Sequence, residues 1–108
     1  MKDRKDASMV LEMAVLDVIA GQENDFEFAF RNASRIISSM DGYISHQLQH
    51  CMEKQNRYLL LVHWESLEAH TVGFRGSEKY LEWKKLLHHF YDPFPVVEHY
   101  ELTFKNPA

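Results

Sequence analysis

Five of the chain's seven histidines and both of its tryptophans lie in one stretch, residues 63–99, HWESLEAHTVGFRGSEKYLEWKKLLHHFYDPFPVVEH. Such a group of histidines is typical of a metal site, of a catalytic pocket, or of hydrogen-bonded positions in and around a core. Arg75 is the single arginine of this stretch and lies between glycines in the sequence GFRGS. The elements that carry these residues decide between the three interpretations.

The spacing of the histidines disfavours a metal centre. A zinc site needs three or four ligands that converge tetrahedrally. His88 and His89 are adjacent, so on a helix their side chains point about 100° apart. The gap from His63 to His70 crosses a strand-to-helix turn and matches no recognised ligand spacing. Cys51 is the single cysteine, which excludes a cysteine-based zinc cluster and an intrachain disulfide. We therefore expect no metal.

Length and composition predict one globular domain. The chain has 108 residues, of which 45% are hydrophobic, and its net charge of -4 comes without a basic stripe. These properties argue against nucleic-acid binding, and the longest apolar run is too short to cross a membrane. We expect a flexible N-terminal extension over residues 1–8, a single domain over 9–104 and a tail over 105–108. The polar first residues predict a cytoplasmic protein.

The first half of the chain predicts a strand, a helix and a hairpin. Residues 9–21 are aliphatic on both alternating faces, as in a central strand. Over residues 22–40 the apolar side chains recur at helical spacing: Phe26, Phe30, Ala33, Ile37 and Met40. Residues 43–52 and 57–64 then alternate as two strands joined by the turn EKQN.

The second half predicts a broken helix, a longer helix and a last strand. Ser66 starts a short helix over SLEAH, which the glycines of VGFRGS interrupt. Ser77 starts a second helix over residues 78–91, and the prolines of DPFP end it. Residues 96–104 are strand-like. The order is that of an α+β, ferredoxin-like βαββαβ fold: a four-stranded antiparallel sheet with both helices on one face. The apolar other face predicts a homodimer through the sheets.

Several segments together resemble one family over residues 9–104. They are GQENDFEFAF, DGYISHQL, YLLLVHWESLEAH, FRGSEKY and YDPFPVVEHYE. The chain is identified through them as similar to the antibiotic biosynthesis monooxygenase family of dimeric α/β barrels. The resemblance implies a homodimer in which each subunit keeps a pocket between its sheet and its helices.

The same resemblance implies several activities. Some members of the family oxygenate polyphenols or quinols without metal or flavin, and others degrade haem. The haem-degrading branch uses an asparagine, a tryptophan and an axial histidine, and alignment through Gly21 puts these near Ala14, near Gly73 or Phe74, and near Trp83 or Lys84. All three residue types are missing there, so haem binding through His88, one turn later, is the less favoured alternative.

We therefore expect a cofactor-independent monooxygenase that acts on a small aromatic substrate, quinol-like or polyketide-like. Such chemistry needs a base, for which His70 or His99 is the candidate, because a neutral imidazole accepts a proton near pH 7. Arg75 would hold an anionic oxygen. The substrate-binding candidates are His63, Trp64, Phe74, Arg75, Trp83 and Tyr91. A non-catalytic dimer that binds a small molecule stays open as the alternative.

Overall fold

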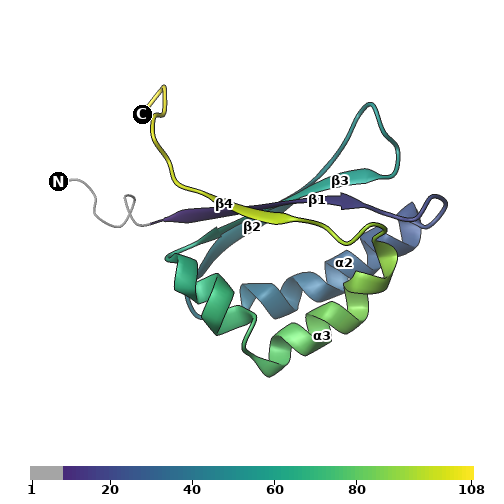
Figure 1. Ribbon diagram of the computed structural model, residues 1–108, viewed down its shortest axis with the longest axis horizontal. Helices are drawn as coiled ribbons and strands as arrows, with labels where there is room; N and C mark the ends of the chain where they lie inside the picture. Colours follow the sequence, from purple (N-terminus) through teal and green to yellow (C-terminus); the bar gives the residue numbers. More distant parts are fainter. Residues whose placement is uncertain (1–8) are drawn as a thin grey trace.

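The computed structural model describes residues 9–108, so the predicted N-terminal extension lies outside the described residues. The elements follow in the order β1 (Val10–Asp17), α2 (Glu23–Ser38), β2 (Tyr43–His50), β3 (Arg57–Trp64), the π-helix η1 (Ala69–Phe74), α3 (Glu78–Leu87), the 3-10 helix η2 (His88–Phe90) and β4 (Val97–Tyr100). Figure 1 shows the sheet as one layer and the helices as a second layer beneath it.

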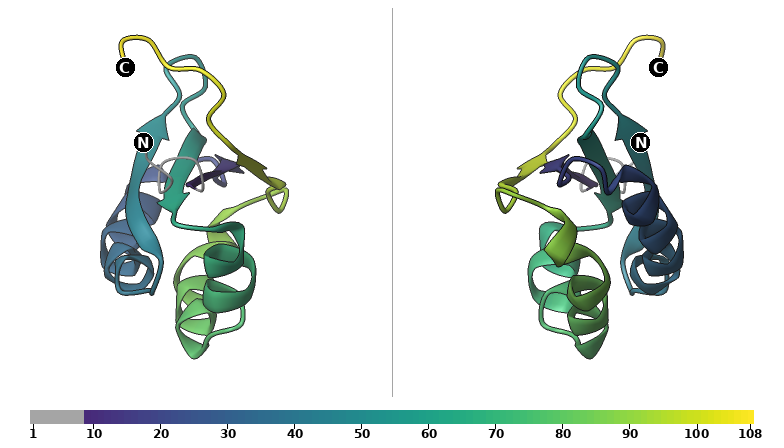
Figure 2. Two further views of the ribbon diagram at one scale, coloured as in Figure 1. Left: turned by 90° about the vertical axis from the view of Figure 1, so that its left-hand side faces the viewer. Right: turned by 90° about the vertical axis from the view of Figure 1, so that its right-hand side faces the viewer.

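The four strands form one antiparallel sheet in the order β2-β3-β1-β4. Ala14 of β1 pairs with Leu60 of β3 on one side and with Val97 of β4 on the other. Side views show every helix on the same face of the sheet (Figure 2). This arrangement confirms the predicted ferredoxin-like fold, in which β4 is an edge strand.

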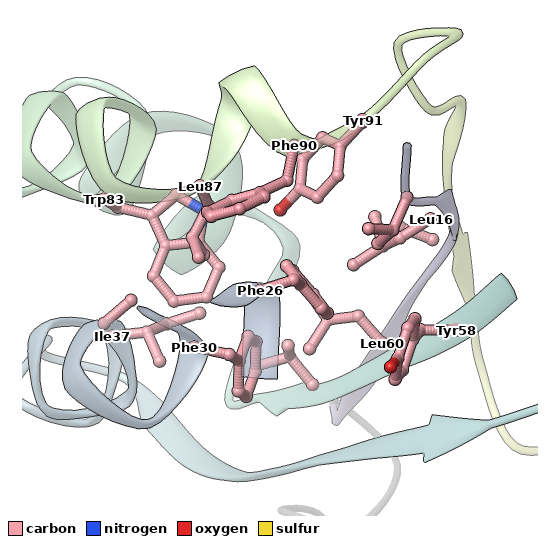
Figure 3. Packing of buried hydrophobic residues seen from close by; sticks show 14 of the residues in the cluster. Leu16, Phe26, Phe30, Ile37, Tyr58, Leu60, Trp83, Leu87, Phe90 and Tyr91 are labelled. Atoms are coloured by element: carbon pink, nitrogen blue, oxygen red, sulfur yellow. The ribbon is translucent and has the colours of Figure 1, made fainter. Parts of the chain in front are cut away.

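The core lies between the inner face of the sheet and the helices. The predicted stripe of α2 is buried from Phe26 to Ile37, and acidic side chains in its first turn suit the positive end of the helix dipole. Phe26 packs on Tyr58 of β3, with ring centroids 4.9 Å apart, and on Phe90 of η2 at 5.8 Å (Figure 3). Aromatic rings of α2, β3 and η2 therefore pack together between the sheet and the helices.

Several element boundaries differ from the sequence prediction. The first strand ends at Asp17 rather than at residue 21, and β2 ends at His50 rather than at residue 52. The helix after Ser66 does not stop at the glycines but continues as η1 through Gly73. The second helix leaves α-geometry at Leu87 and ends in the 3-10 turn η2. The last strand covers only Val97–Tyr100, because β1, its one neighbour, pairs with it from Leu11 to Ala14 and no further.

The outer face of the sheet carries apolar side chains without a covering layer. Leu11 and Met13 of β1 alternate with the buried residues, as do Leu59 and Leu61 of β3. Residues 101–108 rise on this side, away from the helices (Figure 1). Within the described part of the chain, no helix has the length and hydrophobicity that a membrane span requires.

Candidate active site

A cavity of about 340 Å³ lies between the inner face of the sheet and the layer formed by η1, α3 and η2. Its floor includes small and aliphatic residues of the sheet, Ala14, Leu16 and Leu60. Its other walls are mostly rings: Phe74, Tyr80, Trp83, His88, Tyr91 and Phe94. A volume above about 300 Å³ with apolar walls and a few polar groups is typical of small-molecule sites.

His70 reaches the cavity because the chain turns sharply after β3. The hydroxyl of Ser66 accepts a hydrogen bond from the backbone N–H of Ala69 at 3.1 Å. Gly42 packs against the same alanine, and a Cβ added at Gly42 would lie 2.6 Å from the Cβ of Ala69. η1 then buries both His70 and Phe74, one turn apart. π-Helical turns of this kind are frequent at functional sites.

Glu12 is the acidic residue of the cavity wall. It lies on the inner face of β1 and is only 6% exposed. Its Oε1 accepts a hydrogen bond from Nε1 of Trp64 at 2.9 Å, and the same oxygen lies 3.4 Å from Nε2 of His70. Trp64 also stacks on His70, with ring centroids 5.4 Å apart. A buried carboxyl therefore touches both a donor and a titratable ring.

His99 completes a cluster of three titratable side chains. It lies on β4 directly across from Glu12 in the register of the two strands. Its Nε2 is 2.8 Å from Nδ1 of His70. Glu12, His70 and His99 thus form a continuous chain of contacts, which we call the acid–histidine cluster. The cluster runs from the wall of the cavity to the edge strand of the sheet.

Burial shapes the protonation of the acid–histidine cluster. It raises the pKa of Glu12, against a smaller lowering by the hydrogen bond from Trp64 and by the charge of Arg75. Burial and then the charges of Arg75 and His99 lower the pKa of His70 to about 3. Burial and the charge of Arg75 also lower the pKa of His99. Water exclusion disfavours the charged form in every case, so both rings are held neutral and the carboxyl is disposed to bind a proton.

Most of the predicted site residues come together. Phe74, Arg75, Trp83 and Tyr91 line the cavity beside His70, and His99 joins them through its hydrogen bond to His70. The backbone N–H of Arg75 donates to the carbonyl of His70 at 3.0 Å, which fixes the exposed arginine beside the cavity. Gly76 is required there because a Cβ would lie 2.5 Å from the carbonyl oxygen of Val72.

Two predicted residues lie elsewhere. His63 is on the outer face of β3, between Leu11 of β1 and Ser45 of β2, so it faces away from the cavity. Strand alternation is the reason, because Trp64 and Val62 take the inner face. Trp64 is completely buried and supports Glu12 and His70 from behind rather than forming the surface of the cavity.

Among the cavity residues that were not assigned to the site from the sequence, three have titratable side chains: Glu12, Tyr80 and His88. The sequence does contain a signal for Glu12, because it shares its strand face with Ala14, Leu16 and Val18, which are buried. A carboxylate on a core face is rare unless it is paired or functional.

In residues 9–108, no three His, Cys, Asp or Glu side chains are grouped so that they could hold a metal ion.

Comparisons with known proteins agree with this fold. The Bacillus subtilis protein YczJ, whose function is uncharacterised, is 60% identical over 93 residues, which are 86% of this chain and 98% of YczJ. A structure from Bordetella bronchiseptica, provisionally assigned as an antibiotic biosynthesis monooxygenase, has a TM-score of 0.86 and 32% identity over 90% of this chain and 99% of that one.

Two relatives of known type are more distant. SnoaB, a cofactor-independent oxygenase from Streptomyces nogalater, has a TM-score of 0.80 at 19% identity, with 94% of this chain and all of SnoaB covered (100%). A mycobilin-producing heme oxygenase of Mycobacterium tuberculosis is 27% identical over 67 residues, 62% of this chain and 64% of that protein. The family model for antibiotic biosynthesis monooxygenases matches residues 9–86. The chain belongs to the antibiotic biosynthesis monooxygenase family.

Proposed function

We propose that this protein is a cofactor-independent monooxygenase that acts on a small aromatic substrate, a quinol or a polycyclic phenol. The observation that carries the proposal is the acid–histidine cluster in the wall of a cavity lined mainly by aromatic rings. Aromatic walls suit a planar substrate, and a buried titratable cluster suits the removal of a proton where water is excluded.

The chemistry needs no external reductant, because the substrate supplies the electrons. Removing a proton from a phenol or its tautomer leaves an anion that can pass electrons to dioxygen. One oxygen atom then enters the product as a carbonyl, and the second leaves as water with two hydrogens of the substrate, both of which the keto tautomer carries on the oxidised carbon. The acid–histidine cluster would hold the proton, and the cavity would keep the anion from solvent.

Arg75 supports the anionic state of the substrate. Its charge lowers the pKa values of Glu12, His70 and His99, so its field reaches the cavity wall from outside. A guanidinium beside the cavity would stabilise a phenolate or carboxylate through charge-assisted hydrogen bonds. The substrate class expected from this arrangement is an aromatic molecule that is acidic.

Haem degradation fits the residues less well. Ala14, near the position that the resemblance gives for the asparagine of the haem-degrading branch, is a buried floor residue of the cavity. Trp83, near the position of the axial histidine, is also buried and packs on Phe74, with centroids 5.7 Å apart. His88 is the histidine that would ligate iron, and its ring packs edge-on against Phe94 at 5.0 Å. A Soret band that shifts on adding haem to the protein, and is lost in His88→Gln, would favour this alternative.

Oxygen uptake is the direct test of the proposed function. Purified, metal-stripped protein is given a panel of quinols and polycyclic phenols, and uptake is compared with autoxidation of each compound. We expect uptake that requires protein and falls when His70 and His99 are both replaced by phenylalanine. His89→Gln is the matched control, because His89 is exposed and does not line the cavity. Full activity of the double variant would show that His70 and His99 are not needed for the reaction. No uptake by the wild type would favour the alternative, a non-catalytic dimer that binds a small molecule.

We also propose a homodimer closed by the outer faces of two sheets. The support is the row of apolar side chains on that face, which includes Leu59 and Leu61 at its centre. Leu61→Lys should shift the mass measured by light scattering from two chains to one, because a lysine cannot be buried there without a partner. Leu81→Lys, the same substitution at an exposed position of α3 in the helical layer, is the matched control. A wild-type protein that is monomeric would contradict this proposal. The cytoplasmic location stays a prediction.

A further inference from the structure

Neither predicted base presents a free ring nitrogen to the cavity. Nδ1 of His70 lies 2.8 Å from His99, and Nε2 lies 3.4 Å from Glu12. The whole His70 residue is 3% exposed. His99 contacts His70 from β4 and is not one of the residues that line the cavity. A substrate in the cavity would therefore have to displace an existing contact to reach either histidine.

Glu12 has an uncommitted oxygen. Oε1 accepts from Trp64 and faces His70, whereas Oε2 makes no hydrogen bond to any residue in 9–108. In the same range, no fully buried side-chain oxygen or nitrogen lacks a hydrogen-bond partner. With respect to residues 9–108, Oε2 is therefore the oxygen of Glu12 that is left for solvent or a ligand, and Glu12 lines the cavity.

Resting on the proposed oxygenase function, we propose that Glu12 is the catalytic base, and that His70 and His99 are positioning residues that connect its carboxyl to solvent. Oε2 takes a proton from the substrate, and the electron pair of the broken bond stays on the substrate anion. That anion reduces dioxygen. The carboxylic acid formed at Glu12 then returns the proton to the oxygen atom that leaves as water, so the carboxylate is regenerated.

Trp64 fixes the direction of the hydrogen bonds in the cluster. An indole N–H only donates, so Oε1 of Glu12 accepts. With Glu12 ionised, the carboxylate favours the proton of His70 on Nε2, which lies 3.4 Å from Oε1, and Nδ1 of His70 then accepts from the Nε2–H of His99. The Nδ1 of His99 is then an open acceptor, and it has no hydrogen-bond partner within the described residues.

Protonating Glu12 through the cluster reverses both tautomers. The proton on Nε2 of His70 moves to Oε1, the proton on Nε2 of His99 moves to Nδ1 of His70, and His99 takes a proton from solvent at Nδ1. Both rings are neutral before and after. One proton is therefore exchanged between a buried carboxyl and the half-buried edge of the sheet without a charged imidazole, which burial of His70 disfavours.

The groups around Glu12 are consistent with a carboxyl that accepts the proton of the substrate. Trp64 faces it from β3, His70 from η1, Arg75 from the turn after η1, His99 from β4 and Tyr91 from the end of η2. Of these, Trp64 and Arg75 favour the carboxylate, and burial opposes it more strongly. Burial therefore favours a bound proton on the carboxyl and disfavours an added proton on either imidazole.

The first test follows tautomers by nitrogen-15 NMR of the histidine rings. As pH crosses the ionisation of Glu12, read from its carboxyl carbon-13 shift, His70 and His99 should change tautomer together. In Glu12→Gln the amide oxygen still accepts from Trp64, but the tautomer change should disappear. A single tautomer for His70 at every pH, or a change that persists in Glu12→Gln, would overturn the relay.

The second test isolates proton removal from oxygen chemistry. A polycyclic phenol whose anion absorbs at longer wavelength is bound under nitrogen. The wild type should bind it as the anion, and Glu12→Gln should bind it in the neutral form with affinity within about tenfold. His89→Gln, which alters an exposed histidine that does not line the cavity, should behave as wild type. Ionisation retained in Glu12→Gln, or lost in His89→Gln, would contradict the assignment of Glu12. Ionisation without oxygen uptake would instead sink the oxygenase and keep Glu12 as the base.

Discussion

Two partly buried histidine clusters in this molecule look alike but differ in what surrounds them. His70 contacts Glu12 and His99 beside a cavity. His46 of β2 contacts the hydroxyl of Ser34 on α2 at 2.8 Å and the hydroxyl of Tyr43 on its own strand. Burial lowers the pKa of both histidines.

The difference lies in the partners. Hydroxyl groups both donate and accept, so the two nitrogens of His46 are satisfied in either tautomer and no charge is involved. The acid–histidine cluster contains a carboxyl, lies in the electrostatic field of Arg75 and borders a cavity. A buried histidine is therefore not a sign of catalysis by itself. A carboxyl with a free oxygen at a cavity is the more informative feature.

Replacing the central ring of each cluster should give the largest contrast. His70→Phe keeps the stacking on Trp64 but cuts the path from Glu12 to His99, so we expect kcat for oxygen uptake to fall by about 10²-fold. The pH–rate profile should also shift, because the environment of Glu12 changes. Circular dichroism checks that the variant folds. A kcat equal to that of the wild type in folded His70→Phe would show that the acid–histidine cluster, like the His46 cluster, has no role in catalysis.

Removing the charge beside the cavity should have the next largest effect. Arg75→Met keeps the length of the side chain, and loss of a charge-assisted hydrogen bond of about 1.5–3 kcal/mol should raise KM for an acidic substrate by about 10- to 100-fold. Neutral analogues should show little change. Steady-state oxygen uptake with an acidic and a neutral compound of the same ring system makes the comparison, and an equal change in KM for both would contradict the role of Arg75.

Changes in the His46 cluster should alter the stability of the fold but not the catalytic rate. His46→Phe leaves the hydroxyls of Ser34 and Tyr43 without their partner, which should lower the free energy of unfolding by about 1–3 kcal/mol. Oxygen uptake per folded molecule should be unchanged. Urea unfolding with the Ser34→Ala variant as a partial control measures the loss. A fall in the kcat of His46→Phe comparable to that of His70→Phe would contradict the proposal that only the acid–histidine cluster takes part in catalysis.

The sequence predicted the scaffold better than it predicted the site. The apolar stripe of α2 and the alternation of β3 follow from the period of local elements, and both are confirmed. The π-helix was missed because Gly73 and Gly76 were interpreted as a break, whereas the structure uses the absence of a Cβ at Gly76 to close η1.

The acid–histidine cluster depends on contacts that no local pattern contains. Trp64 and Glu12 are 52 residues apart, and His70 and His99 are 29 apart. Their proximity follows from the order of the strands, which places β1 between β3 and β4. Grouping histidines by sequence instead placed His63 with the site, although alternation along β3 put it on the opposite face from Trp64.

The smallest expected effect is on the free energy of unfolding, which the buried carboxyl of Glu12 lowers when it is ionised. Its pKa is raised above the ordinary value of 4.5, so the folded state binds the proton more tightly than the unfolded state. Its contribution to stability is therefore present at low pH and is lost as pH rises through the folded pKa. Glu12→Gln keeps an acceptor for Trp64 and removes the buried charge.

The variant should match the wild type near pH 4 and become progressively more stable than the wild type at higher pH. Urea unfolding at several pH values measures the difference, with Ser34→Ala as a variant whose effect should not depend on pH in this way. A Glu12→Gln protein that is less stable than wild type at pH 8 would mean that the surrounding groups stabilise the carboxylate beyond its burial cost. A gain in stability combined with loss of substrate ionisation would show that the fold retains a destabilising carboxyl for chemistry, which the hydroxyl-satisfied His46 does not require.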